Sequence, residues 1–349
     1  MPPSPLYIRR NDMSFSVKER LTDAMMDPRV LLKSAIGVTA ATTFWLGTVF
    51  MVQEPDNLNV GVIQQESNGL LGYTTTRTME EIIDTLLHQP LGYVSNDIAP
   101  PFVFLDNRPA WELGVVKQLQ FMALAMQDEF SRSNAQSKED PNLQAAQSLL
   151  RNDHEKWIMV DYQDRLEDAQ RELEIYRSRL MNDNPRDGQF VSHSTALSYW
   201  LKMVNKSMGS LSQKLSASRG ELQVNTDLVG ESGGKVAWAD SYLIEAHTPW
   251  LEVDNVFYEV RGHAWAMLSL FKAIRVDFDT TLSDKQATAI VDQIIKELEY
   301  ALQPTYSPYV FNGSRYGYGY TPNHSLRLSS DITRATNGIR DLINLLNKG

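Results

Sequence analysis

The chain has 349 residues, of which 42% are hydrophobic, enough to build one large hydrophobic core or two smaller ones. Its formal net charge of −10 argues against non-specific binding to nucleic acid, because that binding needs a surplus of Lys and Arg to replace phosphate counterions. Cysteine is absent, which excludes disulfides, thiolate metal sites and cysteine nucleophiles.

The amino-terminal part of the sequence predicts a single membrane-spanning helix. From Ser34 to Val52 there is no charged residue, and as a helix this segment would be roughly 28 Å long, close to the hydrocarbon thickness of a bilayer. Basic residues precede the segment, whereas the first charges after it are Glu54 and Asp56. The positive-inside rule then predicts a cytoplasmic amino terminus and a periplasmic main domain, anchored in a bacterial inner membrane. A cleaved signal peptide and a buried core helix are the alternatives.

These features divide the chain into four expected parts. Residues 1–27 form a cytoplasmic segment. The membrane helix covers 28–52, because Asp27 before Pro28 is typical of a helix start. Residues 53–77, rich in Asn, Gln and Gly, are expected to be a linker. Residues 78–349 are expected to form one extracytoplasmic domain.

Helical periodicity dominates this last part. Pro109 is expected to open a helix with one apolar face, formed by Trp111, Val115, Leu119, Met122 and Met126. Three later segments carry apolar residues at alternating spacings of three and four, as in helices that pack at shallow angles. They are Tyr162, Leu166, Ala169, Leu173, Tyr176 and Leu180; Leu197, Leu201, Val204, Met208, Leu211 and Leu215; and Phe257, Val260, Ala264, Met267, Phe271, Ile274 and Phe278. The predicted fold class is therefore mainly α: one transmembrane helix followed by a helical bundle.

Capping patterns predict several helix ends. Thr78 with Glu81 predicts a helix from 78 to 88, and Ser283 with Gln286 predicts one from 283 that ends before Pro304. The second helix would bury Ala287, Val291, Ile294, Leu298 and Ala301. A last helix is expected over 331–347. Glycines between residues 224 and 238 indicate a hinge or a short hairpin.

Four short segments resemble a known family. They are Pro109–Gly114 (PAWELG), Ser131–Ser133 (SRS), Glu139–Pro141 (EDP) and Gly209–Ser218 (GSLSQKLSAS). They are similar to the proteobacterial domain-of-unknown-function family twenty-three thirty-three, and the likeness covers nearly the whole chain. The resemblance implies a single-anchor protein of the Gram-negative envelope and transfers no catalytic residues.

The sequence offers no motif for catalysis, metal binding or a cofactor. Its six histidines lack HExxH or paired i,i+4 spacing. His263 follows Glu259 by four residues, which could tune its protonation, although a structural hydrogen bond is the preferred interpretation. Asp128 and Glu129 lie at an expected helix end, where acids oppose the helix dipole; a salt bridge to Arg132 is preferred over a glycosidase-like carboxylate pair.

An aromatic segment is the best binding candidate. It comprises Tyr306, Tyr309, Phe311, Tyr316, Tyr318 and Tyr320, which could contact a sugar or a protein, or could instead fold back and cover the end of the bundle. We therefore expect an interaction, scaffold or accessory subunit of an envelope assembly, with the lipid bilayer and an envelope protein as partners and a glycan as a possible one. The alternative is an envelope enzyme or binding module that acts on peptidoglycan or another glycan.

Overall fold

The structure is a computed structural model that describes residues 28–52, 54–89, 92–95, 106–132, 138–151, 162–182, 187–218, 222–224, 243–245, 248–249, 252–305, 310–311 and 323–348. The chain divides into two compact units, Met1–Gln53 and Glu54–Gly349.

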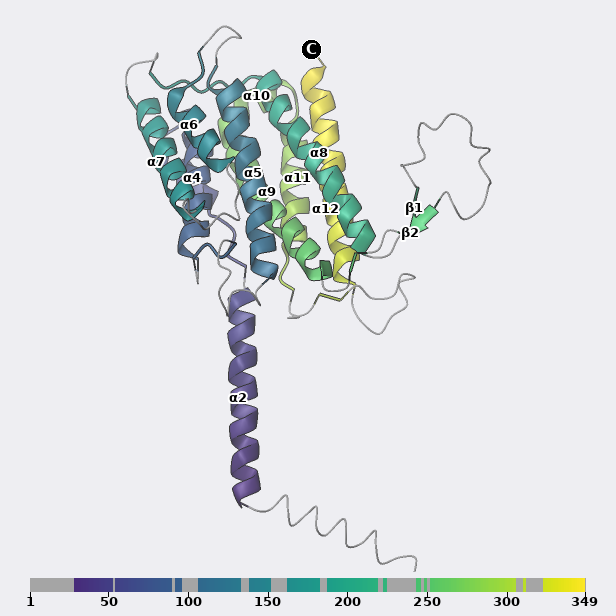
Figure 1. Ribbon diagram of the computed structural model, residues 1–349. Coiled ribbons are helices and arrows are strands. Elements are labelled where there is room, and N and C mark those ends of the chain that lie inside the picture. Colours follow the sequence, from purple (N-terminus) through teal and green to yellow (C-terminus); the bar gives the residue numbers. More distant parts are fainter. Residues whose placement is uncertain are drawn as a thin grey trace, which may run out of the picture. The chain divides into compact units, whose positions relative to one another are not determined.

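The first unit contains one continuous helix, α2 (Pro28–Val52), which covers the residues expected to be helical (Figure 1). Apolar side chains in its first half, such as Leu31, Ile36 and Val38, are exposed. The hydroxyls of Thr42 and Thr43 donate to backbone carbonyls four residues earlier, so both are satisfied within the helix. Among the described residues, no helix is long and apolar enough to cross a membrane.

The second unit is built mainly from helices, which confirms the predicted fold class at that level (Figure 1). Helix α5 continues directly into a π-helical turn, η2 (Met126–Phe130). The α-helices are α3 (Val60–Glu66), α4 (Tyr73–His88), α5 (Asn107–Ala125), α6 (Pro141–Leu150), α7 (Tyr162–Leu180), α8 (Ser194–Ser218), α9 (Val253–Asp277), α10 (Asp279–Asp284), α11 (Thr288–Ala301) and α12 (His324–Asn347).

Two short strands interrupt the helical order. Strand β1 (Leu222–Val224) pairs antiparallel with β2 (Leu243–Glu245), and Gln223 lies opposite Ile244. This pairing agrees with the hairpin alternative of the sequence analysis, whereas the glycines that suggested it lie outside the described residues.

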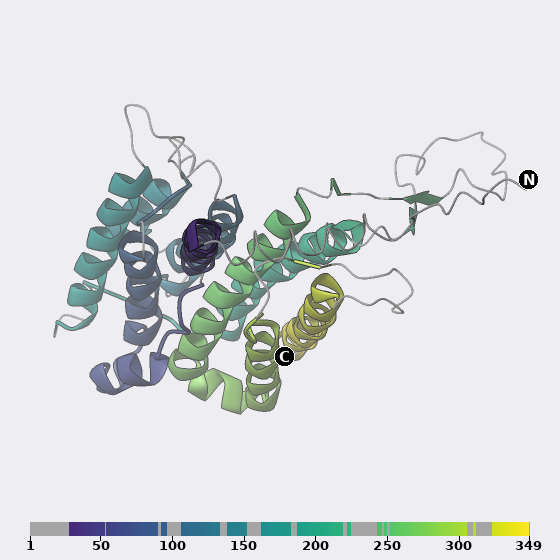
Figure 2. The same ribbon diagram turned by 90° about the horizontal axis from the view of Figure 1, so that it is seen from below.

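Helices α5 and α9 pack along each other and share the largest helix–helix interface of the second unit. On one side of this pair, α4, α6 and α7 pack together, with α4 against α9 and α6 against α5. On the other side, α8 packs against α12, and α11 packs against both α12 and α9. Figure 2, seen from below, shows these two groups on either side of α9.

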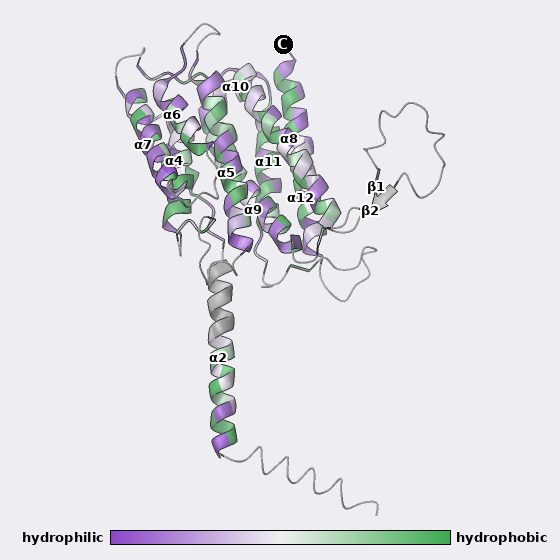
Figure 3. Ribbon diagram, viewed as in Figure 1, coloured by the Kyte–Doolittle hydropathy of each residue, from purple (hydrophilic) through white to green (hydrophobic). Residues whose placement is uncertain are grey.

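The apolar faces predicted from the three- and four-residue spacings form the core. In α7, α8 and α9, every residue of the three predicted faces is buried, including Phe278 directly after α9. The predicted face of the Pro109 helix, from Trp111 to Met126, is buried as well. Figure 3 shows the mixed hydropathy along each of these helices, with hydrophobic and hydrophilic residues in the same turn. The periodicity therefore predicted which sides of these helices are buried.

Two glycines allow α5 and α9 to approach at backbone contact. A Cβ atom on Gly114 would overlap the carbonyl oxygen of Glu259 and lie 2.6 Å from the backbone nitrogen of His263. A Cβ atom on Gly262 would overlap the carbonyl oxygen of Trp111. Because the obstacles are backbone atoms, no change of side-chain rotamer could make room for a larger residue.

Helix α4 begins earlier than its expected capping box. Thr78 is buried inside the helix, and the residue at the amino-terminal cap is Gly72, which has no side chain to offer. Asp277, at the end of α9, takes over this role, because its Oδ2 accepts from the backbone N–H of Thr75 at 2.7 Å and from the Thr75 hydroxyl at 2.6 Å. The prediction of a start at Thr78 was wrong because the capping group comes from a distant part of the chain.

The capping box predicted at Ser283 was also wrong. Residues 279–284 form the separate short helix α10, and Gln286 has a φ of 54°, so the chain turns before α11 starts at Thr288. The predicted buried face of α11 is nevertheless correct, from Ala287 to Ala301. The last helix starts at His324 rather than near 331, with Asn323 Oδ1 accepting from the backbone N–H of Leu326 at 2.8 Å.

In the predicted linker 53–77, the described residues 54–77 are more ordered than expected. They include α3 and the first turn of α4, and Val60 and Ile63 are buried. At the start of the unit, Glu54 forms two 2.5 Å contacts with the Arg261 guanidinium, and the Trp265 indole N–H donates to the Asp56 carbonyl at 3.1 Å. Arg261 also donates to the carbonyls that end α11. The ion pair of Glu54 and the buried apolar residues of α3 thus attach this segment to α9.

Candidate functional site

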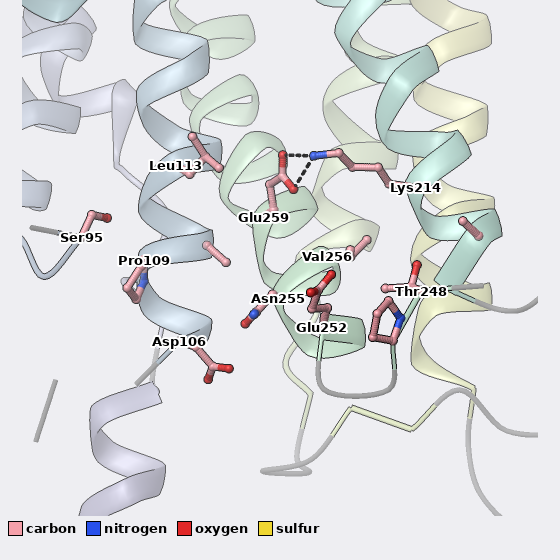
Figure 4. A pocket seen from close by; sticks show the side chains of 13 residues that line it. Ser95, Asp106, Pro109, Leu113, Lys214, Thr248, Glu252, Asn255, Val256 and Glu259 are labelled. Carbon is pink, nitrogen blue, oxygen red and sulfur yellow. Dashed lines mark hydrogen bonds and ion pairs between the residues drawn. The ribbon is translucent and has the colours of Figure 1, made fainter. Parts of the chain in front are cut away.

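One end of the second unit contains a pocket of about 580 Å³ between α5, α8 and α9 (Figure 4). This volume lies within the range of small-ligand and side-chain binding sites. It is lined by Ser95, Asp106, Pro109, Ala110, Leu113, Lys214, Ala217, Thr248, Pro249, Glu252, Asn255, Val256 and Glu259.

Helix ends place these residues together. Pro109 lies in the first turn of α5, where a proline costs no backbone hydrogen bond, so that Asp106 precedes the helix at the pocket edge. The end of α8 is joined to the segment before α9 by a hydrogen bond from the Thr248 N–H to the Ala217 carbonyl at 3.3 Å. Glu252 occupies the cap position of α9, with Asn255, Val256 and Glu259 in its first two turns. The pocket therefore lies between the carboxyl-terminal end of α8 and the amino-terminal ends of α5 and α9.

The pocket combines a carboxylate-rich rim with an apolar wall. The Lys214 ammonium contacts both carboxylate oxygens of Glu259, at 2.7 and 2.8 Å (Figure 4). Asp106 and Glu252 are exposed, and among the described residues neither has a basic side chain at ion-pair distance. Pro109, Leu113 and Val256 supply apolar surface. Together these groups present excess negative charge beside a hydrophobic surface.

Asp254 lies near this rim, and the charge of the rim residue Asp106 affects the pKa of its carboxyl. Burial, followed by the nearby negative charge of Asp106, raises the pKa of the Asp254 carboxyl above its usual range. Hydrogen bonds to the carboxylate, among them one from Asn107, act in the opposite direction. The Asp106 charge is thus close enough to Asp254 to oppose the ionisation of its carboxyl.

A buried carboxylate fixes one wall of the pocket. Glu112 of α5 is fully buried, and its Oε2 accepts from the Ser95 N–H at 2.8 Å and from the Ser95 hydroxyl at 2.6 Å. The same carboxylate accepts from the Val94 N–H and from the Gln89 amide. Burial raises the pKa of Glu112 to about 7, against the opposing effect of these hydrogen bonds and of Arg108. Glu112 therefore holds residues 94–95, including the pocket residue Ser95, against α5.

His263 has a structural hydrogen bond, as preferred from the sequence. The Gln118 side-chain nitrogen lies 2.9 Å from His263 Nδ1, and the ring is buried. Burial, followed by the positive charges of Lys214 and Lys117, lowers the pKa of His263 to about 3. Glu259, which the sequence analysis considered as the alternative influence on its protonation, contacts Lys214. A neutral imidazole in this position is part of the α5–α9 packing.

The predicted aromatic segment lies almost entirely outside the described residues. Of its six members only Phe311 is described; Tyr306, Tyr309, Tyr316, Tyr318 and Tyr320 are not. The Phe311 backbone pairs with His324 in both directions, because its N–H donates to His324 Nδ1 at 3.1 Å and its carbonyl accepts from the His324 N–H at 2.8 Å. The Phe311 ring is partly exposed.

Asp128 and Glu129, the candidate carboxylate pair, do not line the pocket. They lie in η2, at the other end of α5, where Asp128 Oδ2 accepts from the Tyr199 hydroxyl at 2.8 Å. Burial and this contact raise the pKa of Tyr199 to about 12. The Arg132 backbone N–H donates to the Glu129 carbonyl at 3.4 Å. Asp128 is thus part of a contact between η2 and α8.

The sequence analysis did not identify the pocket. Its residues come from four separate parts of the chain. Those from Pro109 to Leu113 and from Lys214 to Ala217 fall in segments that had been singled out for the family resemblance, whereas Glu259 had been considered only as a neighbour of His263. The available signal was the acidic composition around two helix starts, Asp106 before Pro109 and Glu252 before α9. In the described part of the chain, no group of three or more His, Asp or Glu side chains is arranged to hold a metal ion.

Fold and pocket together define a helical-bundle protein with a partly open pocket lined by several carboxylates. The chain belongs to the bacterial family described as "uncharacterized protein conserved in bacteria (DUF2333)", whose model matches residues 23–349. The resemblance seen in the four short segments is thereby confirmed. No curated protein and no solved structure matches the chain.

Proposed function

We propose that this protein is a membrane-anchored binding subunit of a bacterial envelope assembly, in which the α5–α8–α9 pocket receives a basic side chain of a partner protein. The pocket carries this proposal, because excess carboxylates stand beside an apolar wall. A Lys or Arg side chain matches both parts: its aliphatic stem packs on apolar surface while its charged end pairs with carboxylates.

The anchor part of the proposal rests on α2 and its flanking charges. The segment from Ser34 to Val52 is uncharged, helical throughout, and preceded by basic residues. Such a helix would place the second unit outside the cytoplasm and would hold it at the inner membrane. Tethering raises the effective concentration of a binding pocket toward other membrane proteins without any additional contact.

The binding proposal is tested with a minimal ligand. Full-length protein in a neutral detergent is titrated with Nα-acetyl-lysine methylamide, and binding is followed by saturation-transfer NMR. Nα-acetyl-norleucine methylamide, which has a similar aliphatic side chain without the charge, serves as the control probe. We expect binding of the lysine probe only, weakened about tenfold or more by Asp106→Asn with Glu252→Gln, because charge-assisted hydrogen bonds are lost. Equal binding of both probes would overturn the proposal.

A matched variant distinguishes the effect of the pocket carboxylates on affinity from the effect of net charge. Glu174 of α7 and Asp284 of α10 are exposed carboxylates outside the pocket. Glu174→Gln with Asp284→Asn removes the same two charges and should leave the affinity unchanged. If this control weakens binding as much as the pocket variant does, the effect is general electrostatic attraction rather than recognition in the pocket.

The topology is tested separately in cells. Protease is added to intact spheroplasts that contain the protein with an amino-terminal tag. Loss of the large domain with a protected tag fragment supports the proposed orientation. Complete protection of the full-length protein would overturn it.

A glycan-acting enzyme is the second candidate. The neighbouring carboxyl groups of Asp254 and Asp106 favour it, because glycoside hydrolysis uses a pair of carboxyl groups. Release of new reducing ends from purified peptidoglycan, lost in Asp254→Asn, would support this function. Unchanged peptidoglycan after incubation with the full-length protein would count against it.

A further inference from the structure

One ammonium group already occupies the pocket. Lys214 extends from α8 and contacts both oxygens of Glu259 on α9, across the space between the two helices (Figure 4). The two partners differ in exposure: the Lys214 side chain is 46% exposed, whereas the Glu259 side chain is 13% exposed. A largely exposed lysine thus reaches a largely buried carboxylate.

We infer that Lys214 is an internal occupant of a cation subsite at Glu259, and that an incoming alkylammonium or guanidinium group takes its place. This inference rests on the proposed function of the pocket, since it concerns the same site. It assigns Glu259 as the carboxylate that a ligand contacts most deeply and Lys214 as the residue that sets how readily the ligand enters.

Glu259 is held in place more firmly than Lys214. Its backbone lies at the closest approach of α5 and α9, where the carbonyl oxygen of Glu259 would overlap a Cβ atom on Gly114. Lys214, by contrast, has a flexible four-carbon stem that can move into solvent. Displacement therefore moves one side chain and leaves the carboxylate where it is.

The exchange keeps the buried carboxylate paired. A cation that replaces Lys214 leaves Glu259 compensated, so the penalty of an unpaired, largely buried charge is avoided. The released ammonium becomes solvated, and because the Lys214 side chain is already 46% exposed, its release breaks few contacts with the protein. The incoming group would also be close to Asp106 and Glu252, which line the same pocket.

Substitutions at the two residues should change affinity in opposite directions. With the lysine probe and the full-length protein, we expect Lys214→Met to bind about two- to fivefold more tightly than wild type, because an internal competitor is removed. We expect Glu259→Gln to bind about tenfold or more weakly. The double variant should bind as weakly as Glu259→Gln, since Lys214 acts only through Glu259.

The control is Lys206→Met, because Lys206 is an exposed lysine on the same helix, outside the pocket. It removes the same charge and should leave the affinity unchanged. An equal gain from Lys206→Met would assign the effect to net charge and would overturn the inference.

The remaining outcomes distinguish the inference from the proposed function. If wild type binds the lysine probe through Asp106 and Glu252 but Lys214→Met gains no affinity or loses it, only the inference is overturned. If neither wild type nor Lys214→Met discriminates the lysine probe from the norleucine probe, both fail. Binding that is detectable only in Lys214→Met and requires Glu259 supports both.

Discussion

Helices α5 and α9 behave differently at two places only a turn or two apart. Around Gly114 and Gly262 their backbones touch so closely that neither position has room for a Cβ atom. Towards the amino-terminal ends of both helices, the same pair borders a pocket of about 580 Å³. Glu259 belongs to both regions, with its backbone at the crossing and its side chain in the pocket. The comparison indicates that a close helix crossing can hold the lining of an open pocket in a fixed geometry.

Breaking the crossing should have the largest effect on stability. Gly262→Ala places a methyl group against the Trp111 backbone, so α5 and α9 must separate. We expect a loss of about 3 kcal/mol or more in the free energy of unfolding, because overpacking against backbone cannot relax by a rotamer change.

Gly209→Ala is the matched control for this substitution. Gly209 is also helical, in α8, but nothing lies within 4 Å of a Cβ atom there. This change should leave stability unchanged or raise it by about 0.5–1 kcal/mol, because alanine favours helix. Thermal unfolding followed by tryptophan fluorescence measures both variants. Similar stabilities for Gly262→Ala and Gly209→Ala would contradict the close crossing.

The carboxyl-terminal end of α9 contrasts with the pocket, because the carboxylate there accepts hydrogen bonds from another helix of the protein. Asp277 caps α4 through the backbone and hydroxyl of Thr75. Asp277→Ala leaves buried donors unsatisfied, so we expect a loss of about 2–3 kcal/mol. Thr75→Val, which removes only the hydroxyl donor and keeps the side-chain shape, should cost less. The denaturant midpoint of each variant measures the effect, and equal midpoints for Asp277→Ala and wild type would exclude the capping role.

The same contrast explains what could be predicted from sequence. The apolar faces of α7, α8 and α9 follow from local spacing, and all of their residues are buried. The starts of α4 and α11 do not follow from local capping patterns, since Asp277 caps α4 from 202 residues away and α10 interrupts the chain before α11. Local periodicity determines which face of a helix is buried, but a cap supplied by tertiary contact has no local signal.

The pocket was beyond prediction for a related reason. Asp106 and Lys214 lie in different helical segments, and no spacing rule brings the end of α8 beside the starts of α5 and α9. Part of the helix crossing lies in a segment noted in the sequence analysis, because Trp111 and Gly114 belong to a segment that carries the family resemblance. The role of this segment in helix packing follows only from the position of Gly262 on the opposite helix.

The buried Glu112 should produce a pH dependence of intermediate size. Because burial raises its pKa to about 7 from the ordinary value of 4.5, the folded state binds this proton more tightly than the unfolded state. Its contribution to stability is therefore complete below pH 4.5 and is lost as the pH rises to about 7. Within this window the slope should approach about 1 kcal/mol per pH unit.

Glu112→Gln isolates this contribution. Other buried acids with raised pKa values, Glu80 and Asp277, are present in both proteins and cancel in the difference. We expect the stability advantage of wild type over Glu112→Gln to shrink as the pH rises from 5 to 8. A constant difference across that range would show that Glu112 does not titrate there.

The smallest effect on stability is expected in the pocket itself. Asp106 and Glu252 are exposed, so Asp106→Asn with Glu252→Gln should change the free energy of unfolding by no more than about 0.5 kcal/mol. The lost repulsion between Asp106 and Asp254 and the lost attraction of both acids to the helix starts act in opposite directions, and salt screens both. Unfolding curves at low and high ionic strength measure the net change. A large loss would mean that these carboxylates belong to the packed framework, and the contrast between a rigid crossing and a pocket free to bind would no longer hold.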